Sequence, residues 1–439
     1  MPYWKILSTF VRYTYVLYPI YMRKLYFLSF MLLISGSILA AEPYRTRILA
    51  DNIRTLTIGL ADNATELPIL ELNEDQQLEI RFDEMSHETH HYGYTVLHCN
   101  ADWTPSDLST YEYLDGYTNG NITDYNRSIN THYLYTNYQL RIPNYDMNFK
   151  ISGNYVLLIY EDNNKDKLIA QACFSIVEPK VKIDAGIRAN TDIEIRGRYQ
   201  QLDFEVLLQG YYVRDPMSEI KMVVRQNDRL DNEVRDIKPN YVTESKLSFI
   251  NNKDLIFEGG NEYHSFDISS VYNFSRNIDH FEFTNNGYEV ILFPDKIQKG
   301  SYIHDYDANG RFLINHQEAF EDIHTEADYV HVHIKLIADR PFFDGQLYLG
   351  GGYNYNLINY DNRLNYDNTV QAYTKTLLLK QGGYNYQYWF LPKNTSKATV
   401  TRVDGSYWET ENEYTIYVYH RAWGERYDRL IGVGRTYNN

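Results

Sequence analysis

The sequence predicts an all-β protein built as three consecutive β-sandwich domains behind an N-terminal signal peptide. Among its 439 residues are 44 tyrosines and 19 phenylalanines, and aromatic residues favour strands over helices. Short runs in which apolar and polar residues alternate recur along the chain, as half-buried strands require. A hydrophobic content of 44% is enough for packed cores, and a chain of this length usually forms roughly two to four domains.

Residues 1–41 are predicted to be a leader that precedes the mature protein. The basic start Met22–Lys24 is followed by the almost wholly apolar run Leu25–Leu39 and then by two alanines, an order typical of a secretory signal peptide. The run of about 15 residues is shorter than the roughly 20 that span a bilayer. We therefore expect Met22 to be the true start and residues 1–21 to be an over-long gene prediction. An uncleaved anchor is the alternative, because a bulky residue stands at the small-residue position before the cleavage site.

The mature chain is strongly acidic. Residues 1–41 contain four of the 42 basic residues and no acidic one, so the remainder carries 38 basic and 58 acidic residues and a formal net charge of −20. Such a surface repels nucleic acid and anionic lipid headgroups. We therefore expect no nucleic-acid partner, no direct insertion into a membrane, and a soluble protein that is monomeric when free.

Residues 44–178 are predicted to form the first β-sandwich. Strand patterns occur in the runs Leu56–Leu60, Leu78–Phe82 and Tyr92–Cys99. The later run Ser152–Tyr155 resembles the start of a late strand in immunoglobulin-like sandwiches, where a tyrosine bonds back to nearby backbone. We therefore expect an immunoglobulin-like domain with a tyrosine corner in this run.

Residues 180–325 are predicted to form the second β domain. The run Ile220–Arg225 largely alternates between apolar and polar residues. Asn285–Gly287 lies between the two β-type runs Phe281–Phe283 and Tyr288–Phe293, and an Asn-Gly pair in this setting is a strong signal for a hairpin turn. We therefore expect a β-hairpin in this segment.

Residues 326–436 are predicted to form the third domain, whose order of runs resembles the early-set sandwiches. The run Val330–Leu336 alternates strictly, which indicates a strand with one buried and one wet face. The apolar run Leu377–Lys380, the break Gly382–Gly383 and the aromatic run Tyr384–Phe390 predict a strand, a tight hairpin turn and a second strand.

His87–His91 reads His-Glu-Thr-His-His and matches the zinc-protease pattern H-E-x-x-H. That pattern binds zinc on a helix, where the two histidines share a face. Here the five residues stand between two predicted strands with little room for a helix. We therefore interpret them as a polar loop.

Asp305–Gly310 resembles the first half of a calcium-binding loop. The twelfth position counted from Asp305 should hold a bidentate glutamate, and it holds His316. Because Asp-Ala-Asn-Gly also suits a turn, we interpret the segment as a turn. The chain has no nucleophile elbow, P-loop or dinucleotide-binding glycine motif in the required context. We therefore expect no catalytic residues, no cofactor and no metal.

Cys99 and Cys173 are the two cysteines of the chain, and both fall in the predicted first domain. In an oxidising compartment they can form a disulfide, which would close a loop of about 74 residues and add on the order of 4 kcal/mol of stability. The alternative is two buried thiols in separate sheets. The sequence leaves both readings open.

Several sequence blocks resemble those of a known family, the plug proteins of the type IX secretion system of Bacteroidota. Three blocks near the C-terminus, LKQGGYNYQY, TENEYTIYVYHR and RYDRLIG, occupy Leu379–Tyr388, Thr410–Arg421 and Arg426–Gly432. Earlier blocks start at His98 and Phe257, so the resemblance extends over nearly the whole mature chain. The block residues for which we expect a structural or interface role are Trp103, Gly259, Gly260, Asn261, Glu262, Lys380, Gln381, Gly382, Tyr384, Glu411, Asn412, Tyr414, Arg421, Arg426, Tyr427 and Asp428.

The resemblance implies a protein of the periplasm that is associated peripherally with the outer membrane and has no catalytic activity. Its implied partner is the outer-membrane translocon barrel of the type IX system, whose periplasmic end it binds and seals while no cargo is engaged. The alternative is a periplasmic carbohydrate-binding or glycan-active accessory protein, because early-set sandwiches include glycogen-binding domains and aromatic side chains stack on sugar rings.

Overall fold

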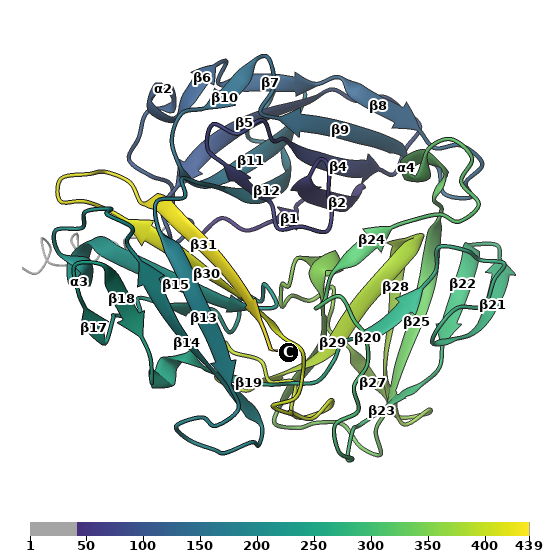
Figure 1. Cartoon of the computed structure of the whole chain (residues 1–439). Helices are drawn as coiled ribbons and strands as arrows, with labels where there is room; N and C mark the ends of the chain where they lie inside the picture. Colours follow the sequence, from purple (N-terminus) through teal and green to yellow (C-terminus); the bar gives the residue numbers. More distant parts are fainter. Residues whose placement is uncertain (1–41, 439) are drawn as a thin grey trace, which may run out of the picture. The chain divides into compact units, whose positions relative to one another are not determined.

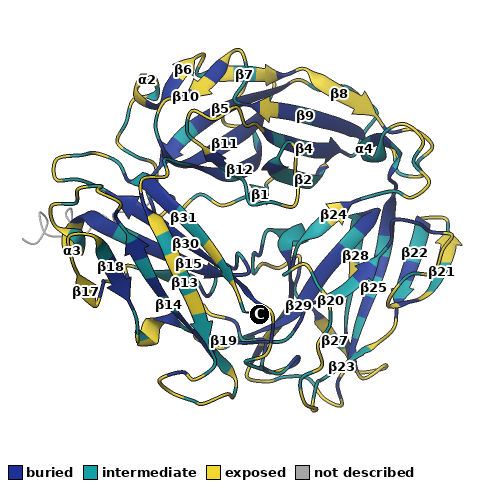
Figure 2. Ribbon diagram, in the orientation of Figure 1, coloured by how far each residue is buried: buried dark blue, intermediate teal, exposed yellow. Residues whose placement is uncertain are grey.

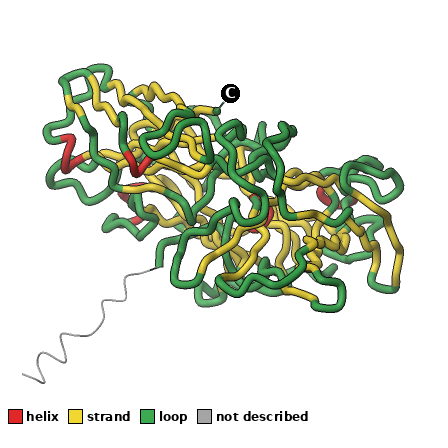
Figure 3. Tube along the Cα trace, turned by 90° about the horizontal axis from the view of Figure 1, so that it is seen from below, coloured by secondary structure: helices red, strands yellow, loops and turns green. Residues whose placement is uncertain are grey.

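The computed structural model describes residues 42–438, so the predicted leader lies outside the described residues. Tyr44–Asn439 forms one compact unit, in which strands dominate and the helices are single turns (Figure 1, Figure 3). The all-β prediction is therefore confirmed. The larger sheets form three pairs, each around its own apolar core, and we name them the first, second and third sheet pairs. Figure 2 shows the buried residues concentrated in their central strands. Between residues 42 and 438, no helix has the length and apolar character that a membrane crossing requires.

The first sheet pair keeps to the predicted first segment. Its elements are β1 (Arg47–Ile48), β2 (Ile53–Leu60), β3 (Ile69–Glu71), β4 (Leu78–Glu84), β5 (Tyr92–Cys99), α2 (Thr110–Tyr113), β6 (Leu114–Gly116), β7 (Asn119–Ile122), β8 (Asp124–Arg127), β9 (Thr136–Ile142), β10 (Met147–Phe149), β11 (Gly153–Glu161) and β12 (Leu168–Val177). One sheet has the strand order β1-β12-β11-β5-β7, with β3 parallel to β12, and the other has the order β2-β4-β9-β8. The predicted tyrosine corner is confirmed, because the Tyr155 hydroxyl donates to the carbonyl oxygen of Ile151 at 2.7 Å.

The second sheet pair combines the middle of the chain with its C-terminal strands. Its elements are β13 (Lys182–Arg188), β14 (Tyr199–Leu207), α3 (Pro216–Glu219), β15 (Ile220–Gln226), β16 (Val234–Arg235), β17 (Tyr241–Val242), β18 (Lys246–Phe249), η1 (Lys253–Leu255), β19 (Ile256–Glu258), β30 (Glu413–His420) and β31 (Arg429–Tyr437). One sheet has the order β13-β14-β18-β17, with β19 beside β14, and the other has the order β16-β15-β30-β31.

The third sheet pair fills the remaining part of the chain. Its elements are β20 (His264–Asp267), β21 (Ile278–Thr284), β22 (Gly287–Leu292), β23 (Asp295–Lys296), β24 (Phe312–Ile314), α4 (Ile323–Glu326), β25 (Tyr329–Ile337), β26 (Gly345–Gly350), η2 (Gly352–Asn354), β27 (Asn365–Asp367), β28 (Ala372–Lys380) and β29 (Gly382–Pro392). One sheet has the order β21-β22-β25-β28-β27, and in the other β29 pairs with β20, β24 and β26.

The pairing of the strands corrects the predicted boundary between residues 325 and 326. β30 lies in the predicted third segment but pairs with β15, placing Ile416 opposite Val224. Conversely, β20 to β24 lie in the predicted second segment and belong to the third sheet pair. The reason is that every residue of β30 is buried, so the backbone N–H and C=O groups on both of its edges need hydrogen-bond partners. The strands β15 and β31 supply them. The division into three domains and their immunoglobulin-like and early-set-like types stay predictions.

The predicted hairpin at Gly382–Gly383 is wrong. β28 and β29 belong to different sheets, and the chain passes from one to the other through Gln381. Gly382 is opposite Ile314 in β24, and a Cβ atom on Gly382 would lie 2.2 Å from the carbonyl oxygen of Leu313. The glycine is therefore required for the close approach of two strands, and no hairpin turn forms there.

Three local predictions are confirmed. β21 and β22 form an antiparallel hairpin around Asn285–Gly287, with a positive φ of 98° at Gly287. His87–His91 lies in the loop between β4 and β5 and forms no helix. Asn309 and Gly310 form a turn with φ angles of 51° and 84°.

Cys99 and Cys173 are free thiols, as the second reading of the sequence has it, but they lie in one sheet and not in separate sheets. Cys99 is opposite Asn154 and Cys173 is opposite Val156, on the two strands that flank β11. Two strand spacings separate their Cα atoms by about 10 Å, and a disulfide requires less than about 7 Å. Burial raises the pKa of both thiols.

We predict that Gly382→Ala destabilises the protein by about 1–3 kcal/mol, because the new methyl group displaces the backbone of β24. The matched control is Gly383→Ala, since a Cβ atom at Gly383 would have no neighbouring atom within 4 Å. Chemical denaturation of both variants measures the difference. Equal free energies of unfolding for the two variants would contradict this explanation of Gly382.

Candidate functional site

The block residues singled out in the sequence lie mainly at the junctions between the three sheet pairs. They do not converge on one pocket. Three buried polar side chains, Lys380, Asp428 and Asn412, each form the centre of one junction. The geometry of each junction explains why polar groups are buried there, since every such group needs hydrogen-bond partners.

Lys380 joins the third sheet pair to the first. It ends β28, and its Nζ atom lies 2.5 Å from the carboxylate of Asp83 in β4. The Lys380 side chain is 1% exposed and that of Asp83 is 0% exposed. Asp83 also accepts hydrogen bonds from the hydroxyl of Tyr329 and from the amide of Asn137, both at 2.7 Å. Lys380 donates a second bond to the carbonyl oxygen of His324 at 2.6 Å, so both charges are well satisfied.

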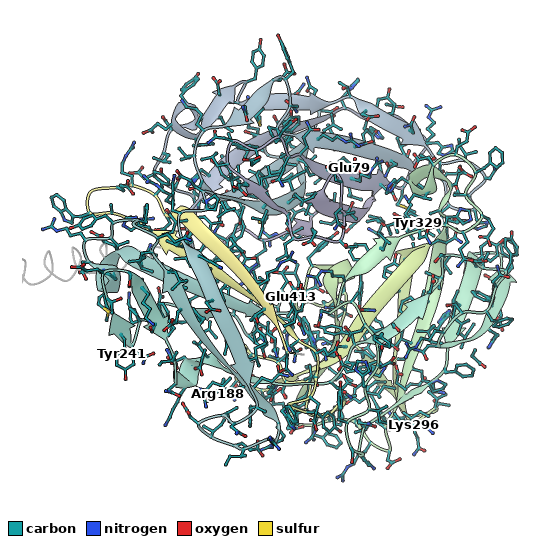
Figure 4. All side chains as sticks on the ribbon, in the orientation of Figure 1. Glu79, Arg188, Tyr241, Lys296, Tyr329 and Glu413 are labelled. Carbon is teal, nitrogen blue, oxygen red and sulfur yellow. The ribbon has the colours of Figure 1, made fainter. Side chains whose placement is uncertain are left out.

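Aromatic rings enclose the Lys380 ammonium group. Its Nζ atom lies 4.1 Å from the ring centroid of Tyr135, the residue just before β9, which is a cation–π distance. Tyr329, labelled in Figure 4, stands at the start of β25 and faces Tyr135 edge-on at 5.5 Å. Burial lowers the pKa of Lys380, and the nearby Asp83 carboxylate opposes this shift. The described residues around the ion pair therefore shield it from water.

Gln381 extends the same junction along the backbone. Its N–H donates to the carbonyl oxygen of Asp328 at 2.9 Å, and its side-chain oxygen accepts from the N–H of Asp328 at 2.9 Å. The Asp328 carboxylate in turn accepts from the N–H groups of His132 and Tyr133 at 2.6 and 3.0 Å. The loop between β8 and β9 is thereby tied to the third sheet pair.

Asp428 joins the second sheet pair to the first. It is 1% exposed and accepts hydrogen bonds from the N–H of Ala101 at 2.9 Å, from Lys221 at 2.9 Å and from Arg421 at 2.8 Å. An apolar cluster surrounds these contacts and comprises Ala101, Val223, Tyr417, Tyr419 and Leu430. One carboxylate is therefore compensated by two cations and by backbone of the other sheet pair.

The residues beside Asp428 add to this junction. Arg426 donates to the carbonyl oxygen of Asp107 at 2.9 Å, and the ring of Tyr427 meets His98 edge-on at 5.4 Å. Tyr419 donates to Asn154 in β11 at 3.0 Å. Burial lowers the pKa of His98 to about 4, so this imidazole is neutral at pH 7.

Asn412 joins the second sheet pair to the segment that leads into the third. Its amide donates to Gln200 at 3.0 Å and to the carbonyl oxygen of Gly259 at 2.7 Å, and its oxygen accepts from Asn227 at 2.7 Å. A Cβ atom on Gly259 would lie 2.0 Å from the carbonyl oxygen of Tyr407. The glycine therefore allows two segments to touch at this point.

Glu413, the residue after Asn412, links the second sheet pair to the third. Its carboxylate, labelled in Figure 4, pairs with Arg311 at 2.7 Å. Gly260 has a positive φ of 66°, and Asn261 donates to the carbonyl oxygen of Asp404 at 2.9 Å. Glu262 accepts from the hydroxyl of Tyr302 at 2.5 Å, and burial raises the pKa of Glu262.

The remaining block residues have mainly structural surroundings. Trp103 is 9% exposed and has a positive φ of 66°, in the turn after β5. Tyr384 packs between Phe266 and Phe312 in the third core. Tyr414 is buried in the second core. Glu411 is tied in through its backbone N–H, which donates to Glu262 at 3.2 Å.

A cavity of about 700 Å³ lies where residues of all three sheet pairs meet. Four of its charged side chains form ion pairs with one another, Arg311 with Glu413 at 2.7 Å and Arg435 with Glu66. Among residues 42–438, no three His, Cys, Asp or Glu side chains are grouped so as to hold a metal ion. We therefore interpret the cavity as part of the junctions.

The tryptophans of residues 42–438 do not form a sugar-stacking groove. Trp103 and Trp389 are buried, at 9% and 0% exposure, and Trp408 is half-buried. Trp423, in the loop between β30 and β31, is 87% exposed. One exposed indole does not make a tryptophan-lined groove.

The sequence did not reveal the partners of these residues. Asp83, Asp328 and Asn154 look like ordinary strand or loop residues. Each contacts a block residue far away in the sequence: Asp83 contacts Lys380, 297 positions away, Asp328 contacts Gln381, 53 positions away, and Asn154 contacts Tyr419, 265 positions away. Asp83 stands near the end of β4, in which apolar and charged residues alternate, so its position gave no signal that its side chain is buried. Nor does that position indicate which cation compensates the carboxylate.

Comparisons with known proteins extend these observations. Residues 53–178 match a family described as the type 9 secretion system plug protein 1st domain. A crystal structure of a hypothetical protein from Parabacteroides merdae ATCC 43184 is similar over 90% of this chain and 100% of its own, with 39% sequence identity and a TM-score of 0.88. Among curated protein sequences no match was found.

We predict that Lys380→Met destabilises the protein by about 3–5 kcal/mol, because it leaves the buried Asp83 carboxylate without its cation. The double variant Asp83→Asn with Lys380→Met should lose less than the sum of the single variants by at least about 1 kcal/mol. Lys335→Met, at a half-buried lysine of β25, is the control and should change stability by about 0.5 kcal/mol or less. Additive effects in chemical denaturation would contradict the proposed coupling.

We predict that His98 makes the protein less stable at pH 5 than at pH 7.5. The folded pKa of about 4 lies below the unfolded value of about 6.5, so only the unfolded state gains a proton in this window. The contribution of His98 to the free energy of unfolding is complete above about pH 6.5 and decreases as the pH falls toward 4. At pH 5 the free energy of unfolding is lower by about 2 kcal/mol. His98→Gln should lack this part of the loss, whereas the exposed His280→Gln should retain it. An identical pH dependence for wild type and His98→Gln would refute the assignment.

Proposed function

We propose that this chain, which belongs to the type IX secretion system plug protein family, binds the periplasmic end of the outer-membrane translocon barrel and seals it while no cargo is engaged. In this role it acts by occupying the opening and performs no catalysis. It is exported to the periplasm and associates with the outer membrane through its protein partner.

The observation that carries this proposal is the way the block residues are used. Lys380, Asp428 and Asn412 hold three sheet pairs together through buried, satisfied polar contacts. Separating the first sheet pair from either of the others would break a buried contact of a charged side chain, namely Lys380 with Asp83 or Asp428 with the backbone of Ala101. Such contacts hold the three sheet pairs in one arrangement. A single stable arrangement suits a stopper for a barrel that is wide enough to leak solutes.

The surface of the described residues suits a reversible contact. Eight tyrosines are each at least 65% exposed, namely Tyr111, Tyr117, Tyr145, Tyr212, Tyr241, Tyr272, Tyr306 and Tyr360. Tyrosine offers a large apolar ring and a polar hydroxyl, and it is enriched where proteins associate without forming obligate complexes. A stopper that leaves and returns needs such a moderate interface.

We predict that deleting the gene makes the outer membrane permeable to large antibiotics that it normally excludes, while secretion continues. The reason is that an empty barrel then stays open. Deleting the barrel as well should restore resistance, because the opening itself is gone. Sensitivity to a large glycopeptide antibiotic in the single and double deletion strains measures this, with the re-introduced wild-type gene as control. Unchanged permeability together with lost growth on one glycan would favour the carbohydrate alternative.

A further inference from the structure

The third sheet pair has an outer strand whose second edge is open. β21 pairs antiparallel with β22 alone, so the N–H and C=O groups along its other edge have no strand partner among the described residues. The strand is seven residues long, and Figure 2 shows that much of it is exposed. An open edge of this length is a template for an additional strand.

Aromatic side chains cluster on β21, on its paired neighbour β22 and on the segment before β21, and we call them the β21 patch: Tyr272, Phe274, Phe281, Phe283 and Tyr288. Phe281 and Phe283 lie on the same face of β21 because they are two residues apart. The ring of Phe283 meets that of Tyr288 edge-on at 4.8 Å between centroids, and the ring centroid of Phe274 lies 5.5 Å from that of Phe281. Phe283 is 64% exposed, and Tyr272 and Phe274 are each 70% exposed. Neighbouring exposed aromatics of this kind mark interaction sites.

The charges on the same strand are acidic. Asp279 and Glu282 have side-chain exposures of 45% and 58%, and both contact the ring of His280, at 3.0 and 3.2 Å. In an antiparallel sheet an added strand places its side chains next to those of β21, so opposite charges stabilise the pair and like charges destabilise it. A basic partner strand therefore fits this edge.

Other edge strands of the described residues are less suited to this role. β2 and β31 pack against β12, and β13 packs against β31. β8 has an open edge but consists of four exposed residues, Asp124–Arg127, with one aromatic side chain. β21 thus combines length, an open edge and exposed aromatic rings.

We propose that the β21 edge is the docking site for an extended segment of the outer-membrane partner, in which apolar and basic residues alternate. The segment adds to the sheet as a strand, with its apolar side chains on the β21 patch and its basic side chains near Asp279 and Glu282. This inference rests on the proposed function, because it assumes an outer-membrane partner. A second copy of this chain fits less well, because both copies would bring the same two acidic residues, Asp279 and Glu282, to the shared edge.

The first experiment tests proximity in cells. The full chain carries the photo-crosslinking amino acid benzoylphenylalanine either at position 283 or at position 343, where Phe343 is 74% exposed in another part of the third sheet pair. We expect a crosslink from position 283 to an outer-membrane protein, within a segment that mass spectrometry identifies as alternating apolar and basic. Crosslinks from position 343 alone, or a segment of another composition, would overturn the proposal.

The second experiment measures binding to detergent-solubilised outer membranes from cells that lack this chain. Phe283→Glu combined with Phe274→Ser should reduce retention of the translocon barrel at least tenfold, and the matched control Phe343→Glu should retain it as wild type does. Glu282→Lys should weaken retention several-fold, whereas Glu244→Lys, at an exposed glutamate of the second sheet pair, should not. Because Glu282→Lys changes only an exposed side chain, it keeps the test valid if the double variant fails to fold.

The outcomes separate the two proposals. If wild-type protein retains no barrel, both proposals fail. If wild type and the β21 variants retain the barrel equally, the docking site is wrong and the proposed function stands. If sedimentation shows a dimer of the free chain that Phe283→Glu dissociates, the edge binds a second copy and the proposed occupant is wrong.

Discussion

The buried ion pair between Lys380 and Asp83 is the contact on which the arrangement of the sheet pairs depends most. A charge in the protein interior is tolerated only where an opposite charge and hydrogen bonds replace its water. Lys380 belongs to the third sheet pair and Asp83 to the first, so neither charge is compensated within its own sheet pair. The ion pair therefore favours one relative position of the two sheet pairs. Tyr329 of the third sheet pair restricts that position further by donating to the same carboxylate, and Asn137 of the first sheet pair holds the carboxylate in place.

The path of the chain reinforces this arrangement. The strands β30 and β31 return from the end of the sequence to complete a sheet that β15 began. Their loop carries Asp428 and Arg421 into contact with the first sheet pair. The second sheet pair therefore does not close until the C-terminal strands are in place. The same strands that complete its core also present the groups of the Asp428 junction, which links folding of the second sheet pair to its contact with the first.

A rigid unit with an exposed strand edge has a simple consequence for function. The junctions engage most of the polar side chains of the blocks that resemble the plug family in contacts within the chain. The exposed aromatic side chains remain, and those around β21 lie next to unpaired backbone. Structural and contact roles thus fall on different residues, and a variant at the surface can test one role without disturbing the other.

Local structure was determined by the sequence alone, whereas the junctions were decided by the tertiary structure. The tyrosine corner at Tyr155 and the hairpin at Asn285–Gly287 were predictable because each depends on a few adjacent residues. The hairpin prediction at Gly382–Gly383 failed because two glycines between two strands do not show why the glycines are needed. Gly382 is needed for the close approach of its backbone to β24, and it forms no turn. The pairing of β30 with β15, and of Lys380 with Asp83, joins residues about 200 and 297 positions apart. No local pattern encodes such pairs, because burial selects partners by their position in space once the sheets have packed.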